Sequence, residues 1–450
     1  MSPTQHKDVV IIGAGLSGLA AASELNDHAV VLEKNPKPGG LVQSVCFNGY
    51  WFDHVLHLLY FNNKQTEKRI KNLLGTSLAN CGGKAVVESL SGNCRFPIQL
   101  HLSSLPKNIV AGCLQDIAEL TYREKRPYTK NFKDWLLNTF GNTLCNEFML
   151  PYNNKMWKRP LQELVPANFN WNITRPDFKK VVQGALETDK EFDAYNSNGW
   201  YPRPPADSPV RGMGYLSHMM SREITGLRHG HTIKNIHVKN RSIDVESADG
   251  NYTIKYEHCI ATCPLPQMSN ICDSLPDVIR SDLGRLRHNC VTSVALNIRG
   301  KKPDNSELWR YYADENIIFT RLIFMHIFDP LSSPENGWGL LVELTHRAED
   351  SIIDESELTE RVVQDIMKVG ILSDADEILE INIMTADPAY VVFNKDTQAI
   401  IEKAQNYLEK NSIHTLGRYG RWEYSSMSQV ITDGYALGKK LNESLLGVVL

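Results

Sequence analysis

Residues 8–25 most constrain what this chain can fold into, because an apolar run leads directly into a Gly-x-Gly-x-x-Gly turn and an Ala-rich stretch. The pattern predicts a tight turn at Gly13, close approach of the backbone to a pyrophosphate at Gly15, and close helix–strand packing at Gly18. N–H groups at the start of the helix would bind the anion. The next apolar run ends in Glu33, whose carboxylate suits a ribose 2′-hydroxyl and disfavours a 2′-phosphate. We therefore expect a dinucleotide-binding βαβ unit here.

A second glycine pair, Gly39-Gly40, follows the ribose carboxylate, and the sequence Phe-Asn-Gly-Tyr-Trp-Phe-Asp comes soon after it at residues 47–53. This order resembles the start of the amine oxidase and protoporphyrinogen oxidase-like FAD superfamily. In that superfamily the segment runs under the flavin end of an extended FAD. The alternative is an ordinary polar loop. The resemblance implies FAD as the cofactor.

Composition excludes several other classes of function. The net charge of −4 and the pI near 6.4 give no basic surface for nucleic acid or an anionic membrane. The sequence contains no run of 18 apolar residues and no signal or transit peptide, so we expect a cytoplasmic protein with a small-molecule partner. The nine cysteines lack Cys-x-x-Cys spacing, so we expect reduced thiols and no metal site. A homo-oligomer is compatible with the sequence.

Hydrophobic spacing divides the chain into regions. Apolar residues at i, i+3, i+4 spacing predict helices near residues 105–120 and 131–140. Short alternating runs between residues 233 and 256 predict a β-meander. Strands around a helix at residues 355–369 predict a second sheet. A C-terminal helix near residues 434–442 is expected to return to the first region.

The expected fold class is α/β: a Rossmann-type FAD-binding domain with a helical insertion and a second, mixed-sheet substrate domain. The expected domains are a discontinuous FAD-binding domain of residues 1–95, 210–290 and 415–450, a helical domain of residues 96–205, and a substrate domain of residues 291–414.

Six separated segments resemble the UDP-galactopyranose mutase family, and its eukaryotic-type branch more than the shorter bacterial one. The first, residues 52–57, is similar to the family's Phe-Asp-x-Gly-Gly-His, whose histidine lies beside the flavin; here that residue is His57. Val55 and Leu56 replace the two glycines, and their Cβ atoms would restrict the peptide flip that accompanies flavin reduction in the family. From the residues alone, a histidine in this apolar setting is more often a core residue.

Two further segments resemble the family's uridine pocket. Phe96 and Gln99 lie in a sequence similar to Pro-Tyr-Pro-Phe-Gln, where an aromatic ring and an amide hold the uracil. Residues 148–157 match Phe-x-x-Pro-Tyr-Asn-x-Lys-x-Trp, which completes that pocket. Without the resemblance, these aromatics would be assigned to the core.

A diphosphate needs fixed positive partners, preferably guanidinium groups. The resemblance assigns Arg321 to that role, together with tyrosines, and Arg175 as a second, imperfectly aligned arginine. It also makes Arg418 a flavin-facing cation, which would stabilise an anionic reduced flavin. The loop at Met427 and Gln429 is shorter than in the family, which puts its cofactor contacts in doubt.

The resemblance thus implies three sets of residues. The catalytic set is His57, Arg321, Tyr390 and Tyr424. The cofactor-binding set is Gly13, Gly15, Leu16, Ser17, Gly18, Glu33, Lys34, Gly39, Gly40, Leu41, His57, Val238, Arg418, Met427 and Gln429. The substrate-binding set is Phe96, Gln99, Phe148, Tyr152, Asn153, Trp157, Arg175, Trp309, Tyr311, Arg321, Tyr390 and Tyr424.

The implied reaction interconverts pyranose and furanose forms of a UDP-sugar without net oxidation, through a bond between N5 of the reduced flavin and the anomeric carbon. NADPH or NADH would serve only to reduce the flavin. Three rivals remain open: a flavin oxidase or desaturase, other flavin chemistry on a nucleotide sugar, and a non-catalytic FAD-binding protein.

Overall fold

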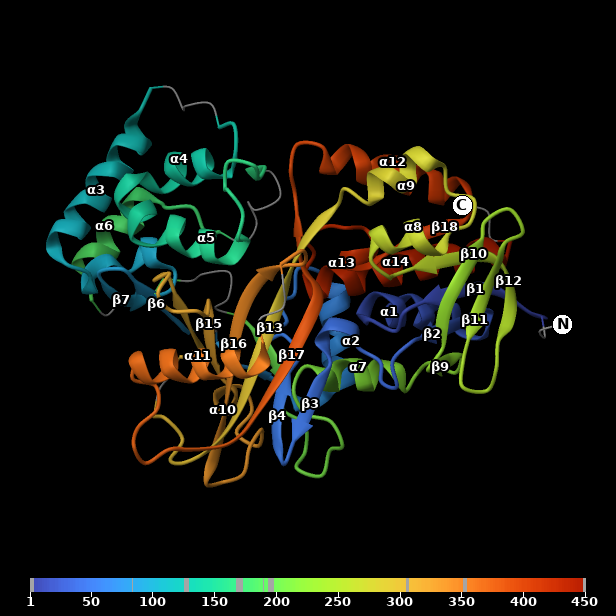
Figure 1. The fold of residues 1–450 in the computed structure, drawn as a ribbon, viewed down its shortest axis with the longest axis horizontal. Coiled ribbons are helices and arrows are strands. Elements are labelled where there is room, and N and C mark those ends of the chain that lie inside the picture. Colours follow the sequence, from blue (N-terminus) through green and yellow to red (C-terminus); the bar gives the residue numbers. More distant parts are fainter. Residues whose placement is uncertain are drawn as a thin grey trace.

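The computed structural model describes residues 4–82, 84–124, 129–166, 173–188, 190–192, 198–304, 307–350 and 354–447. A helical region, a long twisted sheet and a sheet flanked by helices follow one another across the molecule; the sheet flanked by helices contains the N-terminal strand and is called the first sheet below, and the long twisted sheet is called the second (Figure 1). The expected α/β class is confirmed. In the described part of the chain, no helix combines the length and apolar character that crossing a bilayer requires.

The first sheet contains the predicted βαβ unit. Its strands, in spatial order, are β10 (Thr232–His237), β11 (Ser242–Glu246), β12 (Tyr252–Ala261), β1 (Thr4–Ile12), β2 (Ala29–Glu33) and β9 (Leu227–His229), and β18 (Ile413–Thr415) also pairs with β12. β1 runs parallel to β2 and to β12, and its residues Val9 to Ile12 are buried. A strand that is covered on both faces has apolar residues at consecutive positions, which explains the unbroken apolar run of β1.

The β-meander predicted between residues 233 and 256 is confirmed, because β10, β11 and β12 pair antiparallel. Its last strand extends beyond the predicted range. β12 continues to Ala261 and pairs in parallel with β1 along its length.

Helices cover this sheet, and two of them pack unusually close together. They are α1 (Leu16–Leu25) and α14 (Met427–Leu445). A Cβ on Gly434 would lie 2.5 Å from the Ser17 carbonyl oxygen, and one on Gly438 would lie 2.4 Å from that of Ala21. The Ala-rich composition of α1 therefore reflects helix packing, and the expected return of the C-terminal helix to the first region is confirmed. The other helices near this sheet are α2 (Lys64–Leu74), α7 (Gly214–Ser221), α8 (Met268–Ile271), α9 (Asp277–Leu283), α12 (Thr397–Lys410) and α13 (Gly417–Gly420).

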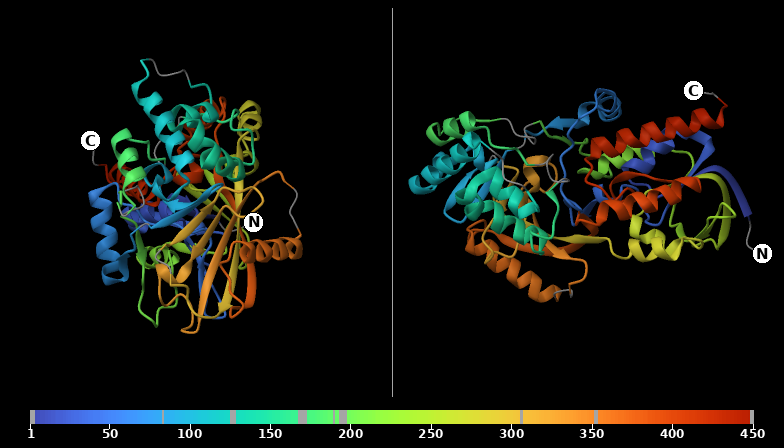
Figure 2. Two further views of the ribbon diagram at one scale, coloured as in Figure 1. Left: turned by 90° about the vertical axis from the view of Figure 1, so that its left-hand side faces the viewer. Right: turned by 90° about the horizontal axis from the view of Figure 1, so that it is seen from above.

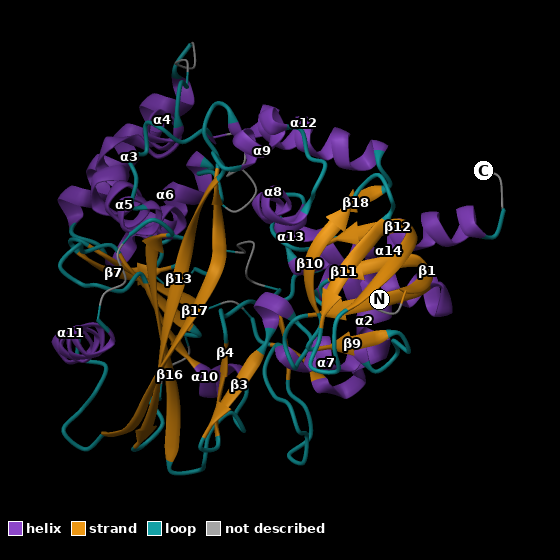
Figure 3. Ribbon diagram, turned by 45° about the vertical axis from the view of Figure 1, so that its right-hand side comes forward, coloured by secondary structure: helices purple, strands orange, loops and turns teal. Residues whose placement is uncertain are grey.

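The second sheet is mixed, as expected. Its order is β17 (Glu377–Val392), β13 (Arg287–Arg299), β16 (Gly337–Arg347), β15 (Arg321–Phe324), β14 (Trp309–Tyr312), β6 (Ala85–Ser89) and β7 (Gly92–Arg95). Leu358, Val362 and Ile366 of α11 (Glu355–Lys368) pack on one face. The hairpin β3 (Ser44–Phe47) and β4 (Tyr50–Asp53) lies on the other face (Figure 3). The short helix α10 (Met325–Phe328) follows β15.

Strand pairing bears on the proposed domain boundaries. β6 and β7 lie in the range assigned to the FAD-binding domain, but they pair within the second sheet. α12 lies in the range assigned to the substrate domain, but it packs with the core of the first sheet. The boundaries remain a proposal. β6 and β7 pack with the second sheet and α12 packs with the first, in each case the other region from the one assigned.

The helical region contains α3 (Lys107–Tyr122), α4 (Phe132–Leu144), α5 (Leu150–Trp157) and α6 (Phe178–Leu186), with a π-helical turn at Cys145–Met149. Both predicted helices, α3 and α4, are confirmed. A further strand pair, β5 (Leu78–Asn80) and β8 (Trp200–Pro202), brings the chain back from this region. Seen from above, the helical region and the first sheet lie at opposite ends of the molecule (Figure 2).

Candidate functional site

A single continuous cavity of about 1040 Å³ is lined by the first sheet, the second sheet and the helical region. Pockets for one small ligand usually enclose about 300–1,000 Å³. The cavity volume lies at the upper limit of that range. We call its two parts the dinucleotide end, at Gly13, Gly15 and Glu33, and the substrate end, at Arg321 and Tyr390.

Two glycine loops meet at the dinucleotide end. Gly13 has φ +98° and Gly39 has φ +123°, which side chains rarely adopt. The Gly39 N–H donates to the Ala14 carbonyl oxygen at 2.8 Å. A Cβ on Gly13 would lie 2.4 Å from the Thr262 hydroxyl, whereas a Cβ on Gly15 would meet no atom within 4 Å. The backbone at Gly15, the N-cap of α1, thus borders open space, as close approach by a pyrophosphate requires.

Glu33 lies at the end of β2 with its carboxylate buried beside this space. One oxygen accepts from the Ala14 N–H at 2.8 Å, and the other accepts from the Asn35 N–H at 2.9 Å. These bonds fix the carboxylate, and each oxygen keeps a further lone pair for a ribose hydroxyl. The residues present fit the dinucleotide that the sequence predicts.

Most of the predicted cofactor set lines the cavity. These residues are Gly13, Gly15, Leu16, Ser17, Glu33, Lys34, Gly39, Gly40, Leu41, His57, Arg418 and Met427. Gly18 does not line it: its hydrogen faces the Gly13 carbonyl oxygen, which a Cβ would approach to 2.2 Å, so Gly18 serves helix–strand packing. Val238 lies past the end of β10, where its N–H donates to Asp273. Gln429 also lies outside the lining and donates to Asp433. These three residues do not line the cavity, and their part in cofactor binding remains a prediction.

His57 lies between the two ends of the cavity. Its Nδ1 is 2.8 Å from the Val55 carbonyl oxygen, which can only accept, so Nδ1 carries the hydrogen and Nε2 is left as an acceptor. Burial lowers the pKa of His57 to about 4; the Val55 carbonyl opposes the shift, and Arg418 and Arg321 add to it. The imidazole is therefore neutral at neutral pH.

The Val55–Leu56 peptide is bonded at both of its polar groups. The Leu56 N–H donates to Glu343 at 3.3 Å, and the Val55 carbonyl oxygen accepts from His57 Nδ1 at 2.8 Å. The Leu56 carbonyl oxygen, in the next peptide group, accepts from Arg321 at 3.3 Å. Val55 and Leu56 are both buried. The side chains that replace two glycines thus accompany a peptide whose N–H and C=O are both bonded.

Arg418 belongs to α13, against the start of α14. Its guanidinium donates to the Ser425 and Ala389 carbonyl oxygens at 3.3 and 3.4 Å and lies over the Tyr424 ring at 4.9 Å. Its Nε is buried and has no hydrogen-bond partner among the described residues. A cation held in this way fits the flavin-facing role that the resemblance implies.

At the substrate end, Arg321 pairs with a buried acid that the sequence analysis did not single out. Arg321 on β15 and Glu343 on β16 are direct cross-strand partners, and Arg321 Nη2 lies 2.6 Å from Glu343 Oε2. Burial alone would lower the pKa of Arg321, but Glu343 and neighbouring tyrosines raise it above its ordinary value. One sequence signal could have found Glu343: it is a lone acid in the apolar run of β16, as Arg321 is a lone base in β15.

Aromatic rings surround Arg321. Tyr152 stacks on Phe148 at 5.0 Å between ring centroids and meets the edge of Tyr311 at 5.5 Å. Phe96 lies 5.6 Å from Tyr311. Burial raises the pKa of Tyr152, Tyr390 and Tyr424, so their hydroxyls stay protonated at neutral pH. Tyr424 donates to the Val391 carbonyl oxygen at 2.8 Å.

The structure brings nearly all of the predicted substrate set to this end. The lining residues of the set are Phe96, Gln99, Phe148, Tyr152, Asn153, Trp157, Trp309, Tyr311, Arg321, Tyr390 and Tyr424. Asn153 already bonds within α5, to Met149 and Trp157, and the Gln99 amide donates to the Thr174 carbonyl oxygen. Arg175 is the exception: it is exposed, lies 5.8 Å over the Trp135 ring, and does not line the cavity. Further polar lining residues, for which the sequence predicted no role, include His54, Tyr60, Glu343, Thr345 and Thr385.

Solved structures with this fold carry different chemistries. A reduced UDP-galactopyranose mutase matches with a TM-score of 0.88 at 20% identity, covering 98% of this chain and 96% of that one. A fatty acid isomerase from P. acnes matches at 0.63 and 14%, covering 96% and 98%. A cyclohexylamine oxidase from Brevibacterium oxydans matches at 0.67 and 14%, covering 98% and 99%. At these identities the likeness shows the fold alone.

A family model decides the membership. The model described as flavin containing amine oxidoreductase matches residues 16–385. That range begins just after Gly13 and Gly15, contains Glu33 and the Gly39-Gly40 loop of the dinucleotide end, and includes the second sheet as far as Thr385 of β17. It supports FAD as the ligand of the dinucleotide end. The chain belongs to the flavin containing amine oxidoreductase family.

Proposed function

We propose that this protein is a flavin-dependent UDP-sugar mutase that interconverts the pyranose and furanose forms of its substrate. One observation carries the proposal: the cavity continues from the glycine loops past His57 to a cation, Arg321, ringed by tyrosines. An amine oxidase needs no fixed cation for a diphosphate. A nucleotide sugar does, because its two phosphates carry negative charge.

The roles of the chain's own residues follow from their chemistry. Arg321 and the hydroxyls of Tyr311 and Tyr390 bind the diphosphate, while Phe96 and Gln99 hold the uracil. The Tyr424 hydroxyl joins them by exchanging its bond to the Val391 carbonyl oxygen for one to a phosphate oxygen. Phe148, Tyr152, Asn153, Trp157 and Trp309 complete the walls. The Arg321 charge remains against the diphosphate as it departs from the anomeric carbon, which stabilises the leaving group.

Reduced FAD, when bound, would supply the electron pair that bonds reversibly to the anomeric carbon. His57 stays neutral beside it and offers Nε2 as an acceptor, and Arg418 contributes positive charge. The walls align the sugar and exclude water. NADPH or NADH acts only as the reductant, and we place the reaction in the cytoplasm.

The test is anaerobic incubation of the purified flavoprotein with UDP-galactopyranose or UDP-galactofuranose, with and without dithionite, followed by separation of the isomers. Interconversion that requires reduced flavin is the expected result. Absence of interconversion by the reduced protein, with UDP still perturbing the flavin spectrum, would contradict mutase action on this sugar and direct the search to other nucleotide sugars.

A FAD-dependent oxidoreductase is the second candidate, and the bonded Val55–Leu56 peptide favours it. A peptide held at both its N–H and its C=O cannot turn with flavin redox state unless two bonds break. This candidate predicts turnover of an electron acceptor with a substrate that lacks a nucleotide. Stopped-flow reoxidation with and without a UDP-sugar separates the two candidates.

A further inference from the structure

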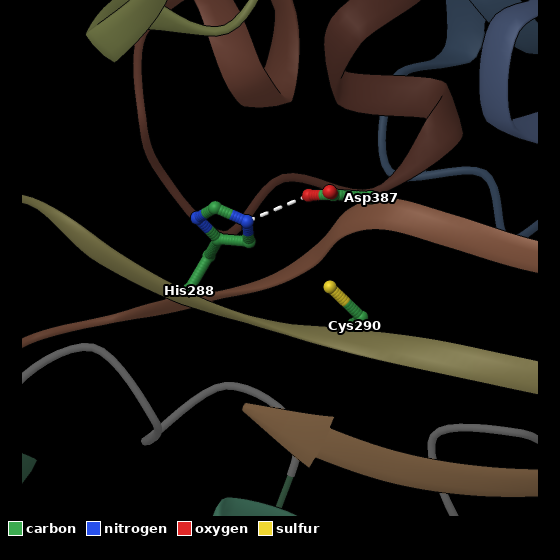
Figure 4. A group of neighbouring side chains, drawn as sticks. All are labelled: His288, Cys290 and Asp387. Carbon is green, nitrogen blue, oxygen red and sulfur yellow. Dashed lines mark hydrogen bonds and ion pairs between the residues drawn. The ribbon is translucent and has the colours of Figure 1, made fainter. Parts of the chain in front are cut away.

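Three side chains of different chemistry converge at the junction of β13 and β17, on segments far apart in the sequence. His288 and Cys290 lie two residues apart on β13, and Asp387 comes from β17 (Figure 4). The ligand atoms of all three lie within 4.8 Å of one another. His288 Nε2 is 2.6 Å from Asp387 Oδ1.

The sheet geometry creates this convergence. Residues two apart on a strand share a face, which places His288 and Cys290 on the same side of β13. The pairing of β13 with β17 is irregular here: Asn289 pairs with Tyr390, but Val291 pairs with Ala386. The extra residues of β17, Asp387 to Ala389, leave the ladder as a bulge. The bulge brings Asp387 over His288 and Cys290.

The three groups are the ligand types that zinc takes in proteins: an imidazole nitrogen, a thiolate sulfur and a carboxylate oxygen. A thiolate and a carboxylate together balance the charge of one divalent cation, so the bound site is neutral although Cys290 is buried. The Asp387 side chain is 61% exposed and His288 is 23% exposed, which leaves a path for the ion. Asp387 is hydrogen-bonded to the Cys290 thiol as well as to His288, so the three side chains form one connected cluster.

We propose that His288, Cys290 and Asp387 bind one Zn²⁺ ion, with a fourth position open to water. The ion replaces the His288–Asp387 hydrogen bond with two metal–ligand bonds and takes the thiol as its thiolate, releasing the proton to solvent. The spacing of the cysteines predicts no metal site, because these three ligands are distant in sequence and meet only through the β-bulge.

The site borders the cavity through Asp387, whereas His288 and Cys290 do not line it. Asp387 and Pro388 line the cavity, and Tyr390 follows three residues after Asp387. Zinc would therefore hold in place the segment that leads to Tyr390. This consequence is secondary, and the metal site stands or falls independently of the mutase activity.

The test uses the full-length flavoprotein, stripped with a chelator under reducing conditions and titrated with Co²⁺ as a probe for Zn²⁺. Bound metal is counted by mass spectrometry. Cobalt d–d bands are read at wavelengths longer than the flavin absorption, so FAD does not mask them. We expect one equivalent of metal and bands typical of thiolate ligation in a distorted tetrahedron.

Two variants of the site and two matched controls decide the result. Cys290→Ser should abolish the thiolate bands, and Asp387→Asn, at an exposed side chain, should weaken binding by about 100-fold, because even partners outside the ligand shell matter 10–100-fold. Cys46→Ser removes an exposed cysteine elsewhere. His28→Gln breaks another exposed His–Asp pair, with Nδ1 at 2.6 Å from Asp8. Both controls should bind as the wild type does.

Two outcomes would overturn the proposal. One is a wild-type protein that binds no stoichiometric Co²⁺ or Zn²⁺. The other is full binding by folded, flavin-loaded Cys290→Ser and Asp387→Asn, which would locate the ion elsewhere.

Discussion

The two ends of the cavity recognise anionic groups by different means. At the dinucleotide end, backbone N–H groups and glycines shape the site, and its main parts lie between Gly13 and Gly40. At the substrate end, side chains from the helical region and the second sheet do so, around the Arg321–Glu343 pair. Where backbone N–H groups bind the anion, an added side-chain atom would occupy the ligand's space, but no charged side chain has to be buried. Where a charged side chain binds the anion, burying it costs free energy, and an oppositely charged partner must offset that cost.

The largest effect we expect comes from removing one member of the buried pair. Arg321→Met leaves Glu343 buried without its partner, which should lower the free energy of unfolding by about 3–5 kcal/mol. Chemical denaturation measures the loss, and flavin fluorescence titration measures UDP affinity. UDP affinity should fall strongly in any protein that remains folded with FAD bound.

A double variant separates stability from binding. Arg321→Met with Glu343→Gln removes both charges and should recover most of the stability without recovering UDP affinity. Arg310→Met is the matched control, because Arg310 lies on neighbouring β14, pairs with Glu307 and Glu88, and does not line the cavity. Equal UDP affinity in Arg321→Met and Arg310→Met would remove the diphosphate role of Arg321.

The dinucleotide end was predictable from the sequence because its geometry is local. Gly13, Gly15 and Glu33 lie on consecutive elements, and each is needed for a reason that its residue type reveals. The strands with continuous apolar runs, and the helices with apolar residues at i, i+3, i+4 spacing, were predictable for the same reason. The sequence did not predict that β12 continues from the meander into a parallel pairing with β1, because that pairing joins segments far apart in the chain.

The substrate end was only partly predictable. Resemblance led to Arg321 and the tyrosines, but Glu343 depends on a cross-strand register that pairs residues 22 positions apart. The exposed position of Arg175 and the bulge at Asp387 likewise depend on how distant segments pack. Composition and periodicity carry no information about such register.

Two glycine variants sharpen the contrast within the dinucleotide end. Gly13→Ala introduces a Cβ at φ +98° and against Thr262, so unfolding free energy should fall by about 1–3 kcal/mol. Gly15→Ala meets no protein atom and has an ordinary φ of −71°, so stability should change by less than about 0.5 kcal/mol.

The order of the two variants should be reversed for FAD affinity: relative to the stability that it loses, Gly15→Ala should lose more FAD affinity than Gly13→Ala. In Gly15→Ala the added methyl occupies the space for the pyrophosphate, so FAD affinity should fall by about 10- to 100-fold, which is about 1–3 kcal/mol. The ratio of flavin absorbance to protein, measured at limiting FAD, checks this. A fully flavin-loaded Gly15→Ala protein with wild-type FAD affinity would contradict the assignment of Gly15.

A pH experiment tests whether the His57 imidazole, which lies between the two ends of the cavity, is neutral in the folded protein. Its pKa is lowered to about 4 in the fold, from an unfolded value near 6.5, so the unfolded chain binds the extra proton first. The stability from His57 is present above about pH 6.5 and is lost as pH falls toward 4. Between pH 7 and 4.5 the wild type should lose about 1–2 kcal/mol more than His57→Asn, a shift discounted for partial exposure. Parallel pH profiles for the two proteins would refute the buried neutral imidazole.

The smallest effect should come from Arg175, and it marks where the substrate end stops. Arg175 is exposed and lies over Trp135, outside the cavity lining, although resemblance had assigned it to the diphosphate. An exposed cation–π contact contributes about 0.5–1 kcal/mol, so Arg175→Ala should lose no more than that in unfolding free energy. UDP affinity should change by less than about twofold, since one phosphate contact contributes more than the 0.4 kcal/mol this represents. A tenfold or larger loss of UDP affinity, at unchanged stability, would mean that Arg175 reaches the diphosphate when substrate binds. The helical region would then move toward Arg321 on binding, and the site would close around its ligand.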